Sequence, residues 1–124
     1  MRILLIDDDR LILKSLEKKL TEEGHQISLA ENSIVALQSL EHQAIDLVIS
    51  DIMMPNMSGL DLLSLLKKFY YSRTPIIIMS SLKNAELVES SLGLGAYCFL
   101  SKPIDMAELM IAVEKSKELA STHS

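Results

Sequence analysis

The chain has 124 residues, a formal net charge of −5 and an apolar content of 48%. This length fits a single domain, and the apolar content is enough for a hydrophobic core, which excludes a disordered or fibrous chain. The acidic balance excludes a surface built to bind nucleic-acid phosphate, and no apolar run approaches the ~20 residues that cross a bilayer.

Five short apolar runs alternate with segments of helical periodicity. The runs predict strands over residues 3–6, 26–30, 47–50, 76–79 and 97–100. Four of them are almost unbroken in hydrophobicity, which is typical of strands covered by helices on both faces, whereas 26–30 alternates and fits a strand nearer the sheet edge. Apolar side chains at helical spacing lie between the runs: Leu13, Leu16 and Leu20; Ala36, Leu37 and Leu40; Leu62, Leu65, Leu66 and Phe69; and Leu109, Ala112 and Val113.

Residues at the expected helix ends support this division of the chain. Gly24 and either Gly93 or Gly95 can end helices. Strands that alternate with helices predict an α/β fold with a doubly wound parallel sheet. We expect one domain over residues 1–120 and a polar C-terminal tail over 121–124. The single cysteine excludes an internal disulfide and suits a reducing compartment, so we expect a cytoplasmic location. Three residues are of types that cap helix N-termini: Asn32, Ser58 and Asp105.

Polar residues follow four of the predicted strands at their carboxyl ends, where ligands bind in sheets of this kind. Clustered carboxylates repel one another unless a cation compensates them, and oxygen ligands suit Mg²⁺. The alternative is that the three aspartates at 7–9 only cap the helix that follows them, although one aspartate is enough for a cap. The polar segments are Asp7-Asp8-Asp9, Ser50-Asp51, Ser80-Ser81 and Ser101-Lys102-Pro103.

Asp51 is the sharpest candidate for chemistry. It follows an apolar strand, so we expect its carboxylate on an exposed loop, where it could act as a nucleophile towards phosphorus. Lys102 and Ser80, on neighbouring strand ends, could then bind the phosphoryl oxygens. The alternative is a loop aspartate whose carboxylate accepts hydrogen bonds from backbone amides.

In this order and spacing, the motifs resemble the receiver domain of response regulators, the phosphoacceptor of two-component signalling, and the chemotaxis receivers in particular. The resemblance covers essentially the whole chain. It implies a flavodoxin-like (βα)5 fold with strand order 2-1-3-4-5. It also implies a phosphoprotein that is not an enzyme, apart from catalysing its own phosphoryl transfer and slow dephosphorylation. The motifs are Ile6-Asp7-Asp8-Asp9, the segment 47–55 with Gly59, Met79-Ser80 and Ser101-Lys102-Pro103.

The resemblance also assigns roles at the expected site. Asp51 is expected to accept a phosphoryl group from a sensor histidine kinase or a phosphotransfer protein. Asp7, Asp8, Asp51 and the backbone carbonyl of Met53 are expected to hold Mg²⁺. Lys102 is expected to bind the phosphoryl group as a catalytic cation.

Further residues are expected to transmit the signal or shape the site. Ser80 binds the phosphoryl group and forms a switch with Phe99, while Pro55 and Gly59 shape a loop and Pro103 follows a cis peptide bond. The switch acts on the face made by the last strand, 97–100, and the helices on either side of it. That face is expected to control a downstream protein or output domain, with no output domain in this chain. The resemblance leaves open a monomer or a phosphorylation-promoted dimer, and implies no direct contact with nucleic acid or membrane.

Two apolar residues near the site suggest a slow loss of the phosphoryl group. Met53 and Leu82 lie two residues after Asp51 and Ser80, where polar side chains could orient an attacking water. One alternative function is a phosphate-independent, receiver-like interaction module. Another is an Mg²⁺-dependent phosphohydrolase, but that class needs an acid at the position of Met53.

Overall fold

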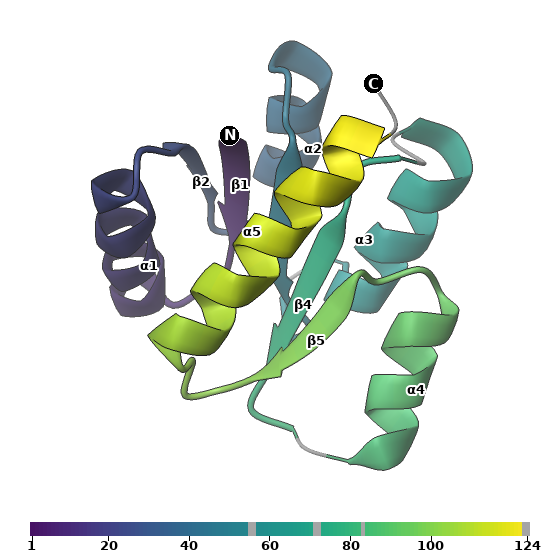
Figure 1. Cartoon of the computed structure of the whole chain (residues 1–124). Helices are drawn as coiled ribbons and strands as arrows, with labels where there is room; N and C mark the ends of the chain where they lie inside the picture. The colour runs from purple at the N-terminus through teal and green to yellow at the C-terminus, as the bar shows by residue number, and fades with distance from the viewer. Residues whose placement is uncertain (55–56, 71–72, 83, 123–124) are drawn as a thin grey trace.

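The computed structural model describes residues 1–54, 57–70, 73–82 and 84–122. Its five strands form one parallel sheet in the order β2-β1-β3-β4-β5 (Figure 1). The predicted doubly wound sheet with strand order 2-1-3-4-5 is therefore confirmed. Within the described part of the chain, no helix is both long and apolar enough to cross a membrane.

Each strand lies within one residue of its predicted bounds. The strands are β1 (Arg2–Ile6), β2 (Gln26–Ala30), β3 (Leu47–Asp51), β4 (Ile76–Ser80) and β5 (Cys98–Ser101). The helices are α1 (Arg10–Glu22), α2 (Ser33–His42), α3 (Gly59–Leu65), α4 (Ala85–Gly93) and α5 (Met106–Thr122), and a π-helical turn, η1 (Leu66–Tyr70), continues α3. Helix α5 thus extends two residues into the expected polar tail, while residues 123–124 lie outside the described part.

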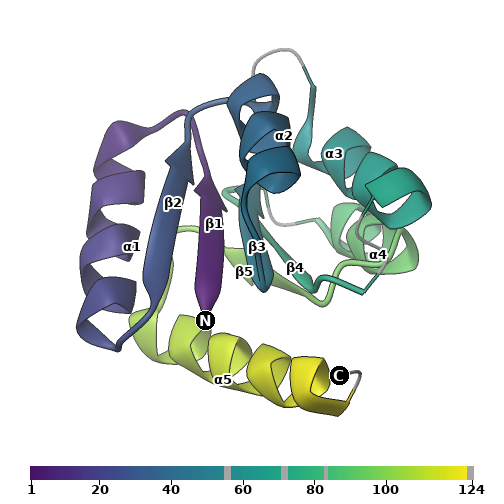
Figure 2. The ribbon, with the colours of Figure 1, turned by 90° about the horizontal axis from the view of Figure 1, so that it is seen from above.

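Helices cover both faces of the sheet, and each face has its own core. Helices α1 and α5 pack on one face, and α2, α3 and α4 pack on the other (Figures 1 and 2). Side chains of β1, β3 and β4 alternate between the two cores, which explains why their sequences are apolar throughout. Because both faces are covered, ligands have access to the sheet mainly at the ends of its strands.

One helical face differs from the prediction. Leu63 is fully buried, whereas Leu65 is only partly buried, so the buried face of α3 consists of Leu62, Leu63 and, at the start of η1, Leu66. The leucine-rich run 60–66 offers two apolar faces, and periodicity alone does not choose between them. The side chain of Phe69 lies outside the described part of the chain.

The expected helix ends are confirmed. Gly24 and Gly95 have φ values of 95° and 107°, in the left-handed region that favours glycine. Asn84 is a further N-cap that the sequence reading missed; it accepts a hydrogen bond from the N–H of Leu87 at 2.7 Å. The predicted caps Asn32, Ser58 and Asp105 accept hydrogen bonds from the backbone N–H groups of Val35, Asp61 and Glu108.

Candidate functional site

Three carboxylates meet at the carboxyl ends of β1 and β3. Asp7, Asp8 and Asp51 each place a carboxylate oxygen within 4.8 Å of the others. The register that pairs Ile6 with Ser50 brings the two strand ends side by side. Asp7 and Asp51 are buried, whereas Asp8 is exposed, so the cluster reaches solvent at Asp8.

Asp51 is more enclosed than the sequence reading predicted. It is the last residue of β3 and only 5% exposed, so the expectation of an exposed loop is wrong. Burial and the neighbouring charge of Asp7 raise the pKa of the Asp51 carboxyl, although Lys102 and a hydrogen bond from the backbone of Met53 oppose this shift. Folding therefore holds this carboxylate in surroundings where an added cation would be favourable.

Lys102 supplies one positive charge to the cluster. Its Nζ lies 2.7 Å from Oδ2 of Asp7 and 3.4 Å from Oδ2 of Asp51. Burial alone would lower the pKa of the Lys102 ammonium, but the hydrogen bond to Asp7 and the charges of Asp51 and Asp7 raise it. The backbone N–H of Lys102 donates to the carbonyl of Ser80 at 2.8 Å, and the peptide bond to Pro103 is cis, as the resemblance implied.

The donor set of this cluster fits a hard divalent cation. All its candidate side-chain ligands are carboxylate oxygens, as Mg²⁺ prefers, and the exposure of Asp8 would give water ligands access. Asp9 has a different role, because its Oδ1 accepts hydrogen bonds from the N–H groups of Leu11 at 2.9 Å and Ile12 at 3.4 Å. The two interpretations of the aspartates at 7–9 therefore apply to different residues: Asp9 caps α1, while Asp7 and Asp8 belong to the cluster.

The switch candidates lie on the two neighbouring strands. Ser80 ends β4 and is fully buried, and its Oγ accepts a hydrogen bond from the N–H of Leu82 at 3.0 Å. Phe99 lies on β5 opposite Ile78 and packs, partly buried, against the core beneath α3 and α4. Among the described contacts, no hydrogen bond or ion pair joins either residue to Asp51, so their switching roles remain predictions.

The loop after β3 is held tightly against the site. A Cβ on Gly59 would lie 2.3 Å from the carbonyl oxygen of Asp51, so no other residue fits there without displacing the backbone. Ile52 fixes the start of the loop, because its N–H donates to the carbonyl of Met79 at 3.0 Å and its carbonyl accepts from Gly59 at 2.8 Å. The role of the Met53 carbonyl stays a prediction, and Pro55 lies outside the described residues.

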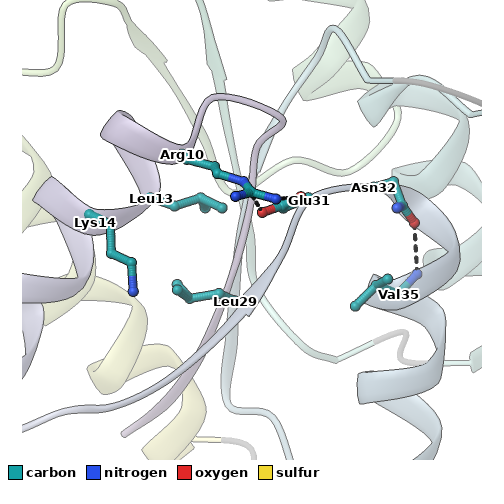
Figure 3. Close-up of a pocket in the computed structure, with 7 residues that line it drawn as sticks. All are labelled: Arg10, Leu13, Lys14, Leu29, Glu31, Asn32 and Val35. Atoms are coloured by element: carbon teal, nitrogen blue, oxygen red, sulfur yellow. Dashed lines mark hydrogen bonds and ion pairs between the residues drawn. The ribbon is translucent and has the colours of Figure 1, made fainter.

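Two hollows are lined in part by α1. One, of about 500 Å³, lies between α1, β2 and the start of α2, where an ion pair of 2.7 Å joins Arg10 to Glu31 (Figure 3). It shares no residue with the acidic cluster. The other, of about 310 Å³, has a mainly apolar lining on α1 and the segment after β5, and Lys102 is among its lining residues. The larger hollow therefore has charged residues of its own, but it lies outside the group of carboxylates that Lys102 contacts.

Known proteins are similar to this chain in sequence and in fold. The sequence pattern of the family described as Response regulator receiver domain matches residues 3–114. The chain is 33% identical over 112 residues to the DNA-binding transcriptional regulator NtrC of Proteus hauseri. This match covers 90% of this chain and 24% of that protein. It is 34% identical over 116 residues to the transcriptional regulatory protein GlrR of Escherichia coli, with 94% of this chain and 26% of that protein covered.

A solved structure is similar over almost the whole of both chains. The signal receiver domain of an HD domain-containing protein from Pseudomonas fluorescens has a TM-score of 0.92 and 31% identity, with 98% of this chain and 97% of that chain covered. The chain spans about a quarter of the length of the two regulators above. With its strand order, its acidic cluster at the carboxyl ends of β1 and β3, and a family match over residues 3–114, the chain belongs to the receiver domains of two-component response regulators.

Proposed function

We propose that the chain is a cytoplasmic phosphoryl acceptor, in which Asp51 receives a phosphoryl group from a phosphohistidine of a sensor kinase or a phosphotransfer protein. The arrangement of Lys102 carries this proposal. Its ammonium contacts Asp7 and Asp51 together, at 2.7 and 3.4 Å, beside the three-carboxylate cluster. The proximity of the proposed nucleophile, the Lys102 cation and the candidate metal ligands supports the proposal, because phosphoryl transfer depends on positioning and charge neutralisation.

The transfer follows from the charges at the site. A carboxylate oxygen of Asp51 attacks phosphorus, the phosphorus–nitrogen bond of the donor breaks, and its electron pair remains on the imidazole nitrogen. Lys102 neutralises charge on the phosphoryl oxygens, and Asp7, Asp8, Asp51 and the Met53 carbonyl are the residues that would hold Mg²⁺. When bound, Mg²⁺ supplies further neutralisation of the phosphoryl charge.

Ser80 is suited to report the modification. Its Oγ already accepts a hydrogen bond from Leu82, so its own proton is available for a phosphoryl oxygen. A phosphoryl group that binds one arrangement of Ser80 and Phe99 more tightly shifts the population towards it. We propose that this changes the α4–β5–α5 face, where Ile111 is 57% exposed beside a hollow of about 400 Å³.

A changed α4–β5–α5 face would act on another protein or on an output domain. The matched relatives NtrC and GlrR are transcriptional regulators, which supports a regulatory output for this chain as well. On this proposal the phosphoryl group controls the contacts of the face, whether it docks on a downstream partner or on a second copy of the chain. On this proposal the chain catalyses no reaction on a separate substrate.

The deciding experiment is phosphorylation by a small phosphodonor, acetyl phosphate, with Mg²⁺. We expect intact-mass spectrometry to show one added phosphoryl group on the wild type and none on Asp51→Asn. Asp61→Asn, which removes a carboxylate outside the cluster, should be modified like the wild type. An unmodified wild type, with no spectral change on addition of beryllofluoride and Mg²⁺, would contradict the proposal and favour a phosphate-independent interaction module.

A further inference from the structure

Ser50 is an unusual residue for its place in the sheet. It lies in the middle strand, β3, between Ile6 of β1 and Ile78 of β4, and it is 1% exposed. Its neighbours in this row are branched apolar side chains that belong to the core beneath α2 and α3. A hydroxyl in such a place loses its hydration and contributes less to apolar packing, so it needs a hydrogen bond in compensation.

The hydroxyl of Ser50 makes its contacts on the site side. Its Oγ donates to the backbone carbonyl of Asp51 at 2.9 Å and lies 3.8 Å from the Sδ of Met54. These two partners lie at either end of the short segment that contains Ile52 and Met53. The same Asp51 carbonyl faces Gly59, whose missing side chain leaves the space that the turn needs.

Met53 depends on its neighbours for its position. Its own side chain is 61% exposed and gives it little anchorage, yet its backbone forms a hydrogen bond to the Asp51 carboxylate. Ile52, on one side, is tied to β4 and to Gly59 by backbone hydrogen bonds of 3.0 and 2.8 Å. Met54, on the other side, is held by packing against the core and by its contact with Ser50.

We propose that Ser50 is a positioning residue for the metal and phosphoryl site, which acts by fixing the backbone from Asp51 to Met54. The inference rests on the proposed function, because it matters only if the Met53 backbone serves that site. Without the hydroxyl, the Asp51 carbonyl loses this donor, and Met54 keeps only its packing against the core. The Met53 carbonyl is then less often in place as a metal ligand, and the acidic cluster binds Mg²⁺ more weakly.

Magnesium affinity is the direct test, and it needs no phosphorylation. The chain has no tryptophan, so binding is followed by isothermal calorimetry and by the amide resonances of residues 51–54. We expect Ser50→Ala to weaken Mg²⁺ binding roughly three- to tenfold, the range expected for one lost hydrogen bond that orients a ligand. Ser116→Ala is the matched control, since Ser116 is also fully buried and donates to a carbonyl, that of Val113 at 2.7 Å, within α5.

A second pair of variants isolates the hydroxyl from the shape of the side chain. Ser50→Thr and Ser50→Val have nearly the same volume, but only threonine keeps the donor. The proposal predicts tighter Mg²⁺ binding by Ser50→Thr than by Ser50→Val at equal thermal stability. It is overturned if the two bind alike, or if Ser116→Ala weakens binding as much as Ser50→Ala. A wild type that binds no Mg²⁺ contradicts the proposed function itself, whereas equal binding by wild type and Ser50→Ala contradicts only the role of Ser50.

Discussion

Removal of the Lys102 ammonium should destabilise the fold in a way that Mg²⁺ reverses. Lys102→Met keeps an unbranched side chain that is one atom shorter, and leaves the buried carboxylates of Asp7 and Asp51 without their cation. At an effective dielectric constant of about 20, contacts of 2.7 and 3.4 Å correspond to gross attractions of about 6 and about 5 kcal/mol. Desolvation offsets most of this, and we expect a net loss of about 3 kcal/mol in the free energy of unfolding.

Urea unfolding with and without Mg²⁺ measures this loss. The variant cluster carries one more uncompensated negative charge, so it should bind the cation more tightly and regain more stability from it than the wild type. Lys14→Met is the matched control, because Lys14 is 73% exposed and pairs with Glu17 at 3.7 Å. Such a surface pair contributes at most about 1 kcal/mol, and its loss should not depend on Mg²⁺.

The pH dependence gives an independent check on the same variant. Burial and Asp7 raise the pKa of Asp51, and loss of Lys102 removes an interaction that opposes this. When folding raises the pKa of an acid, the protonated acid favours the folded state and its ionisation destabilises that state. The folded state therefore keeps this stability in full below the unfolded pKa, about 3.9, and loses it as the pH rises through the folded pKa. The deficit of Lys102→Met should therefore be full at pH 7 and shrink towards pH 4. A deficit below about 1 kcal/mol at pH 7, or one that neither Mg²⁺ nor acid reduces, would refute this account of the cluster.

Three further variants test separate parts of the site. Gly59→Ala places a methyl group 2.3 Å from the carbonyl of Asp51, so thermal or urea unfolding should show a loss of at least about 2 kcal/mol; an unchanged midpoint would contradict this packing. Asp9→Ala removes an N-cap and should cost about 1 kcal/mol of stability in urea, while calorimetry shows an unchanged Mg²⁺ affinity. Met53→Asn combined with Leu82→Glu should speed loss of the phosphoryl group, because polar side chains could then orient an attacking water. An unchanged rate of loss of the phosphorylated protein over time would contradict this prediction.

Sequence patterns predicted the sheet well because its strands are buried on both faces. A run such as 76–79 is apolar at every position and is too short for a helix of the core, so its bounds follow from local composition. The buried face of α3 was harder to predict. Leu63 and Leu65 are chemically identical, and only the packing of α3 against the sheet places the first in the core.

The identities of the site residues were easier to predict from the sequence than their geometry. Asp51 was expected in a loop because it follows the apolar run 47–50, but the partner strands and the close approach of Gly59 enclose it. Most of these contacts come from residues outside that run. The separate roles of Asp7 and Asp9 depend on the residue at which α1 begins, which a run of three aspartates leaves open. Ser50 carried a usable signal that the sequence reading missed: a hydroxyl within an apolar strand that precedes the key carboxylate.

The charge imbalance at the site connects these features to the proposed signal. The Lys102 ammonium contacts two of the three clustered carboxylates, and a phosphoryl group on Asp51 would replace a single charge by nearly two. Lys102 now lies nearer to Asp7 than to Asp51, at 2.7 against 3.4 Å, so phosphorylation would draw it towards the new charge. Its backbone N–H is bonded to the carbonyl of Ser80, which joins the ends of β4 and β5. On the proposed function, a shift of Lys102 that reaches its backbone would act on the ends of β4 and β5, the strands that carry Ser80 and Phe99.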